Sequence, residues 1–116
     1  MPIEHKGLKM EQRHVGAAAV VKISGSAGME EAEFLRRELE ALAGQQIPLA
    51  ILDLSDMSFI SSLGLGAIIS MHLKSRHHGG KIAIVHPQPA VLNVLETTRL
   101  TQLFPIFATI DAAISK

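Results

Sequence analysis

Hydrophobic and polar positions follow two different periods along this chain. Residues 8–14, LKMEQRH, roughly alternate between apolar and polar, which is typical of an edge strand. Residues 17–25, AAAVVKISG, are apolar and β-branched towards their end, and Gly16 separates the two runs, so the pattern predicts an N-terminal hairpin. Residues 47–55 and 81–86 are almost continuously apolar, which predicts two strands that are buried on both faces.

Helical periodicity appears first in residues 29–44, where apolar residues recur at steps of three and four and form one stripe. The preceding turn, GSAG at 25–28, offers Ser26 as a cap for this helix. Gly44 ends the periodic pattern, so we expect the helix to stop there.

Further elements alternate along the second half of the chain. Residues 62–78 and 89–100 predict two helices, and residues 103–108 and 109–116 predict a short last strand and a terminal helix. A hairpin followed by alternating strands and helices predicts an α/β fold: a single domain over residues 1–116 with a mixed sheet covered by helices.

Composition narrows the classes of function. Hydrophobic residues make up 47% of the 116 positions, which is ample for one core. Eleven basic and eleven acidic residues balance, and aromatics are only 3%, so we expect neither nucleic-acid nor anionic-membrane binding. The chain has no cysteine, no run long enough to span a bilayer and no signal-peptide pattern, so we expect a cytoplasmic protein.

Two adjacent serines, Ser61 and Ser62, stand between the buried strand at 47–55 and the helix at 62–78. One of them could simply cap the helix. A nucleophile elbow would need glycine two positions before the serine, where this chain has Phe59 and Ile60, and GLGAII is only half of a dinucleotide fingerprint. A weaker nucleotide or anion site at the start of the helix stays open.

A phosphorylation switch is the fourth reading of the serine pair. A phosphate at a helix start meets unpaired backbone N–H groups and the positive end of the helix dipole, so the fold tolerates it. The same phosphate adds about −1.5 to −2 charges to an apolar surface, which opposes the packing of a partner there.

The stretch from 51 to 107 resembles the anti-sigma factor antagonist family, the STAS domain. FISSLGLG at 59–66 is similar to the family's F-x-D-S-S/T-G-L-G segment, and GGKIAIV at 79–85 and VLETTRLTQLFPIF at 94–107 match later portions. The resemblance implies a non-enzymatic, partner-switching protein. Its partners would be an anti-sigma factor that is also a serine kinase, which would phosphorylate Ser62, and a PP2C-type phosphatase; no cofactor is implied.

This chain departs from the family pattern at two positions. Ser61 replaces the family's aspartate, and Leu63 follows the acceptor. Ser61 is therefore an alternative phosphoacceptor, and a degenerate switch that binds without being phosphorylated stays open. Two rivals stay open as well: a non-switching STAS module that binds protein, lipid or nucleotide beside a transporter or scaffold, and a small enzyme that uses Ser62.

The predicted helix at 62–78 is apolar around most of its circumference, which indicates either deep burial or a second face for a partner. We expect the side of Leu65 and Ile69 to face the core. On the other side, we expect at least one of Leu63, Ala67 and Met71 to be exposed in the free domain. The expected partner-binding residues are the loop and the start of the helix: Asp56, Ser58, Ser61, Ser62, Leu63, Ala67 and Met71.

The six histidines do not indicate a metal site. His72, His77 and His78 share the helix or its end at spacings of five and six, whereas helical metal pairs prefer a spacing of four. We therefore expect surface histidines and no bound metal.

Overall fold

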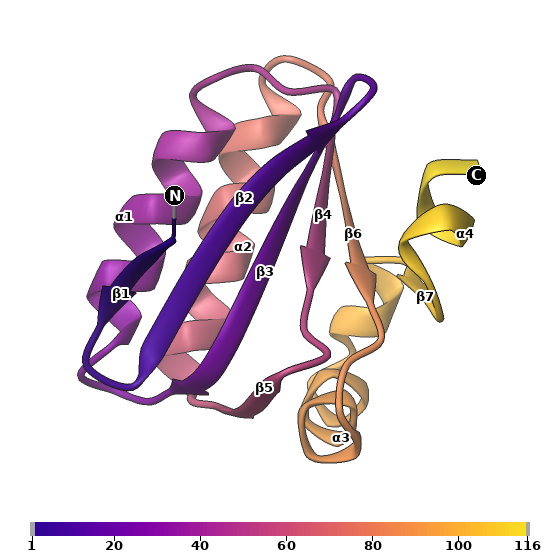
Figure 1. Ribbon diagram of the computed structural model, residues 1–116. Coiled ribbons are helices and arrows are strands. Elements are labelled where there is room, and N and C mark those ends of the chain that lie inside the picture. The colour runs from indigo at the N-terminus through magenta and orange to yellow at the C-terminus, as the bar shows by residue number, and fades with distance from the viewer. Residues whose placement is uncertain (1, 116) are drawn as a thin grey trace.

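A seven-stranded mixed sheet runs through the molecule, with helices on both faces (Figure 1). The computed structural model describes residues 2–115. The strands are β1 (Ile3–His5), β2 (Leu8–Val15), β3 (Ala18–Ala27), β4 (Leu49–Asp53), β5 (Met57–Ile60), β6 (Lys81–Val85) and β7 (Ile106–Phe107). The helices are α1 (Ala32–Ala43), α2 (Ser62–Arg76), α3 (Pro89–Thr97) and α4 (Ile110–Ser115), with a 3-10 turn at Leu100–Gln102.

The strand order confirms the expected mixed sheet with its N-terminal hairpin. β1, β2 and β3 pair antiparallel, and β3, β4, β6 and β7 then follow in parallel. Gly16 turns the hairpin with a φ of 61°, a left-handed conformation that glycine adopts without strain. The edge strand β1 was not predicted; it is three exposed residues long, too short to show a period.

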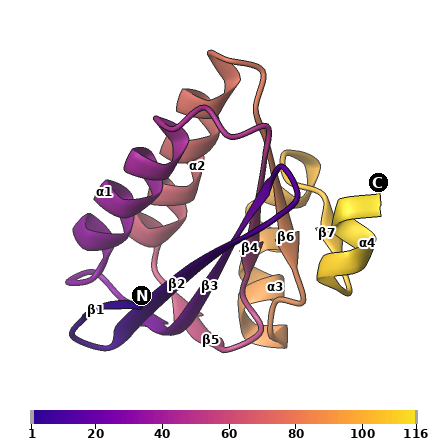
Figure 2. The ribbon, with the colours of Figure 1, turned by 45° about the horizontal axis from the view of Figure 1, so that its top comes forward.

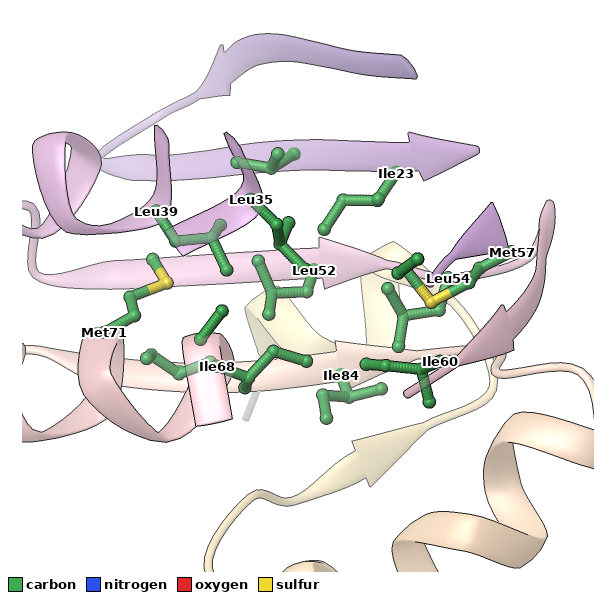
Figure 3. Packing of buried hydrophobic residues seen from close by; sticks show 14 of the residues in the cluster. Ile23, Leu35, Leu39, Leu52, Leu54, Met57, Ile60, Ile68, Met71 and Ile84 are labelled. Carbon is green, nitrogen blue, oxygen red and sulfur yellow. The ribbon is translucent and has the colours of Figure 1, made fainter. Parts of the chain in front are cut away.

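The helices divide between the two faces of the sheet (Figure 2). α1 and α2 pack against each other on one face, where α3 also contributes to the larger core cluster. α4 covers part of the opposite face, where it packs on a smaller cluster that includes Ile51, Ala83 and Val85. In the larger cluster, Leu35 and Leu39 of α1 meet Leu52 of the sheet (Figure 3).

The expected cap at Ser26 is wrong. β3 continues through Ala27, and the backbone N–H of Ser26 donates to the carbonyl of Gly7 at 3.1 Å. The helix starts at Ala32, and its N-cap residue Glu31 makes no side-chain hydrogen bond to the helix. Because parallel pairing with β5 holds Ser26 in the sheet, the turn moves three residues further along the chain.

The strand β5 was also missed, and it determines the geometry of the serine pair. Its residues alternate poorly, with Met57 and Ile60 buried and the two residues between them exposed. Its register with β3 shifts at Gly25 and Ser26, which explains the absence of a period of two. β5 follows β4 along the chain and pairs with the last residues of β3. It ends at Ile60, and α2 begins two residues later at Ser62.

Candidate functional site

The two adjacent serines have different positions at the junction between β5 and α2. Ser61 is the N-cap: it is extended, and its hydroxyl oxygen accepts a hydrogen bond from the backbone N–H of Gly64 at 3.1 Å. Its own N–H donates to the carbonyl of Ala27 at 2.9 Å, so the cap also ties α2 to β3. Only 7% of Ser61 is exposed.

Ser62 is the first residue of α2, and it is exposed. No other residue within 2–115 makes a hydrogen bond to its hydroxyl. The backbone N–H groups of the first helical turn surround this position, and the first turn of α2 contains no acidic residue. The structure thus divides the pair into a buried cap, Ser61, and an accessible hydroxyl, Ser62.

Asp56 and Ser58 lie immediately before this junction, and both are exposed. The carboxylate of Asp56 pairs with the Lys22 ammonium at 3.0 Å, and this hydrogen bond raises the pKa of Lys22. The hydroxyl of Ser58 donates to the carbonyl of Gly25 at 3.3 Å. These contacts attach the start of β5 to β3 and hold the segment before Ser62 in place.

Three exposed apolar side chains are carried by the segments that meet at the serine junction, and we call them the apolar rim: Met29, Phe59 and Leu63. They are 63%, 50% and 53% exposed. Pairing between β3 and β5 joins the segments that carry Met29 and Phe59, and Leu63 follows the cap by two residues. Exposed apolar side chains that form one contiguous patch are typical of a surface that a protein partner covers.

Of the apolar rim, the sequence analysis named only Leu63 as a partner-binding residue. Phe59 lies between Ser58 and Ile60. The residues around it follow no period that would mark its side chain as exposed.

The expectation that Ala67 and Met71 face a partner is wrong. Each is only 1% exposed. Met71 lies beside Leu39 of α1 (Figure 3), because α1 and the sheet cover the side of α2 that the sequence analysis assigned to a partner. Leu63 is the exposed member of the predicted trio, so the expectation that at least one is exposed is confirmed.

The two glycines after the serines, Gly64 and Gly66, differ in how much space surrounds them. A methyl group on Gly64 would come within 2.9 Å of Cγ1 of Ile60 and 3.3 Å of the carbonyl oxygen of Ala27. A methyl group on Gly66 would meet no atom within 4 Å. Gly64 therefore allows α2 to approach β3 and β5 closely. Gly66 makes no such contact and lies on the exposed side of the helix.

The histidines of α2 differ in their surroundings. His77 is exposed, as expected, but His72 is half-buried and its ring meets Phe104 edge to face. Burial, with a smaller contribution from Arg76, lowers the pKa of His72. Within the described part of the chain, no three histidine or carboxylate side chains are grouped so that they could hold a metal ion.

Within residues 2–115, no helix combines the length and the apolar character that a membrane-spanning helix needs.

Known proteins with similar sequences and similar folds include anti-sigma factor antagonists. An anti-sigma F factor antagonist of Paenibacillus polymyxa is 27% identical over 101 residues, which cover 86% of each chain. A crystal structure of an anti-sigma factor antagonist from Mycobacterium paratuberculosis has a TM-score of 0.86 at 25% identity, covering 97% of this chain and 95% of that one.

A third similar protein has been solved with a phosphate attached. The phosphorylated form of the Bacillus cell fate determinant SpoIIAA has a TM-score of 0.71 at 18% identity, covering 91% of this chain and 96% of that one. At this identity the likeness shows the fold alone. The family model of the STAS domain matches residues 9–113. The resemblance seen in the sequence is therefore confirmed, and this chain belongs to the STAS domain family.

Proposed function

We propose that this protein is an anti-sigma factor antagonist that acts by binding, without catalysing a reaction of its own. In its unphosphorylated form it binds an anti-sigma factor that is also a serine kinase, through the start of α2 and the apolar rim. The kinase then phosphorylates Ser62 and ends the interaction, and a PP2C-type phosphatase restores it. This cycle takes place in the cytoplasm, where sigma factors act.

The observation that carries the proposal is the exposed hydroxyl of Ser62 beside the apolar rim. A kinase needs an accessible hydroxyl, and Ser62 presents one at the end of a rigid helix. The partner surface next to it contains Phe59 and Leu63, which are half exposed. A phosphate on Ser62 would place about −1.5 to −2 charges beside these side chains, and a packed partner would have to desolvate that charge.

The same geometry supports Ser62 over Ser61 as the acceptor. Ser61 is only 7% exposed, and its hydroxyl accepts a hydrogen bond from the Gly64 N–H, so phosphorylation there would require the cap to open. A phosphate on Ser62 would instead lie among the N–H groups of the first turn, where the helix dipole favours an anion. The fold would therefore tolerate the modification while the partner would not.

The replacement of the family's aspartate by Ser61 is consistent with this cycle. Aspartate and serine are both favoured N-cap residues, so Ser61 retains the capping role at this position. What the replacement removes is a negative charge next to the acceptor. We infer that the switch is retained and that kinase recognition relies more on the apolar rim.

The relatives add support of a different kind. Proteins similar to this chain carry the name anti-sigma factor antagonist, and SpoIIAA exists in a phosphorylated form. The fold of SpoIIAA thus accommodates a phosphate, which is what the cycle proposed for Ser62 requires.

The direct test is phosphorylation by the cognate kinase. The protein is incubated with the kinase and ATP, and the modified residue is mapped by mass spectrometry in the parent chain and in Ser61→Ala and Ser62→Ala. We expect phosphate on Ser62 in the parent and in Ser61→Ala, and none in Ser62→Ala. Phosphate on Ser61 alone would move the acceptor, and binding without phosphorylation of either serine would indicate a non-switching STAS module.

A further inference from the structure

A cavity of about 460 Å³ opens beside β6 at the edge of the sheet, where residues of α4 and of the segment before β7 line it together with His72 of α2. Its wall includes Lys81 and Ala83 of β6, Phe107 of β7, and Ala113 and Ile114 of α4. Lys81 begins β6, whereas Ser62 follows the carboxyl ends of the parallel strands, and no residue of the serine junction lines the cavity. The cavity is thus separate from the site of the proposed switch.

The cavity exists because β7 is short and the side chains beneath α4 are small. Ala83 and Ala113 belong to the apolar cluster on which α4 packs. β7 pairs with β6 only at Ile84 and Val85, so the first half of β6 has no strand beside it at that edge within the described chain. The space beneath α4 therefore opens at the sheet edge.

The backbone before β7 explains why the edge stays open. Pro105 has no N–H to donate, and the N–H of Phe104 donates to the carbonyl of Leu100 at 2.9 Å instead of to β6. The chain turns away from the sheet at this point, and Leu103 lines the mouth of the cavity, where it is 40% exposed.

Within residues 2–115, the titratable side chains that line the cavity are both basic. They are Lys81 and His72, and most of the other lining side chains are apolar. Lys81 is exposed and forms no ion pair with any other residue within 2–115. His72 has a pKa below the usual value because it is partly buried, so it is neutral at physiological pH and can serve as a hydrogen-bonding group.

We propose that this cavity binds a small amphipathic carboxylate. Its apolar chain would lie beneath α4 against Ala83, Ala113 and Phe107, and its carboxylate would meet the Lys81 ammonium at the mouth. A volume of about 460 Å³ is within the range of roughly 300–1,000 Å³ that small-molecule sites occupy. The combination of an apolar interior and one cation selects an anionic head on an apolar body over a neutral or cationic molecule.

Titration of the ¹⁵N-labelled protein with octanoate, below its micelle concentration, tests the site. We expect saturable shifts of the amide signals of Ala83, Phe107 and Ala113, with the signal of Ser62 unmoved. Octanol, which has the same chain without the charge, should bind about fivefold more weakly, as expected for one exposed ion pair. Absence of saturable shifts at these three residues, or shifts that cluster elsewhere, would overturn the proposal.

Variants of the cavity separate the contributions of the carboxylate and of the apolar chain to binding. Lys81→Gln should remove the preference for octanoate over octanol and leave octanol binding unchanged. Leu103→Asp should weaken octanoate binding at least as much, whereas Leu73→Asp, an exposed leucine outside the cavity, should not change it. If Lys81→Gln binds octanoate as well as the parent does, the assigned carboxylate position is wrong. Both Leu103 and Leu73 are exposed, so each variant should fold, and melting temperatures verify this.

Discussion

The Ser61 hydroxyl accepts a hydrogen bond from the backbone N–H of Gly64, three residues along the chain, with the oxygen and nitrogen 3.1 Å apart. This contact occupies the first of two adjacent serines and leaves Ser62 facing solvent. It also fixes where α2 begins, because the carbonyl of Ser61 accepts the N–H of Leu65 at 2.9 Å. The helix start and the accessible hydroxyl are thus set by the same residue.

The cap contributes to stability, and its removal should be measurable. Ser61→Ala should lower the free energy of unfolding by about 1 kcal/mol, because the Gly64 N–H loses its partner at a buried site. Ser61→Asp should retain most of that stability, since aspartate also caps. Ser62→Ala is the control and should change the free energy by less than about 0.5 kcal/mol. Urea unfolding of the three variants decides, and equal losses for both alanine variants would contradict the assignment of the cap.

Charge at Ser62 should act on binding and leave folding almost unchanged. We expect Ser62→Asp to weaken binding to the anti-sigma factor and Ser62→Ala to preserve it, because only the carboxylate must be desolvated under a partner. Both variants should melt close to the parent, since the residue is exposed. Isothermal titration calorimetry compares the affinities. Equal affinities for the two variants would remove the electrostatic basis of the switch.

Leu63 and Leu73 provide a matched pair for locating the partner surface. They lie on the same helix and are 53% and 52% exposed, but about 15 Å apart, given a rise of about 1.5 Å per residue. Leu63→Lys should weaken binding of the anti-sigma factor by at least about tenfold, as loss of a buried interface contact does. Leu73→Lys should bind like the parent. The opposite order would move the interface towards the far end of α2.

The two glycines of α2 should respond to the same substitution with opposite signs. Gly66→Ala meets open space and should raise the free energy of unfolding by up to about 1 kcal/mol, because alanine favours the helix. Gly64→Ala forces a methyl group against Ile60 and the carbonyl of Ala27, and overpacking of this kind typically costs about 1–3 kcal/mol. We expect the stability order Gly66→Ala, parent, Gly64→Ala in thermal unfolding. A stabilised Gly64→Ala would mean that α2 does not need its close approach.

The sequence was sufficient for the main elements of the fold because their patterns are local. The alternating run of β2, the continuous apolar runs of β4 and β6, and the stripe of α1 each follow a period that depends on one element alone. β5 was not predictable in this way, because its pairing with β3 is irregular and its exposed Phe59 breaks the pattern.

The candidate site, too, could be predicted only as far as local sequence patterns reach. The sequence located the serine pair and the exposed Leu63, but it did not determine which serine caps the helix, because both stand at the junction. A helical wheel gives the angles between residues of α2 but not the position of α1 around it. The apolar side that holds Ala67 and Met71 was therefore assigned to a partner, whereas α1 and the sheet cover it.

The orientation of α2 can be tested at Met71, which is 1% exposed between α1 and the sheet. Met71→Lys should lower the free energy of unfolding by about 3 kcal/mol or more, because the ammonium would be buried without a counter-ion. Met71→Leu is the control: it roughly conserves volume and should cost less than about 1.5 kcal/mol. Urea unfolding measures both. If Met71→Lys were as stable as the parent and lost only partner binding, Met71 would face solvent, and the partner surface would extend along α2 beyond Ser62 and Leu63.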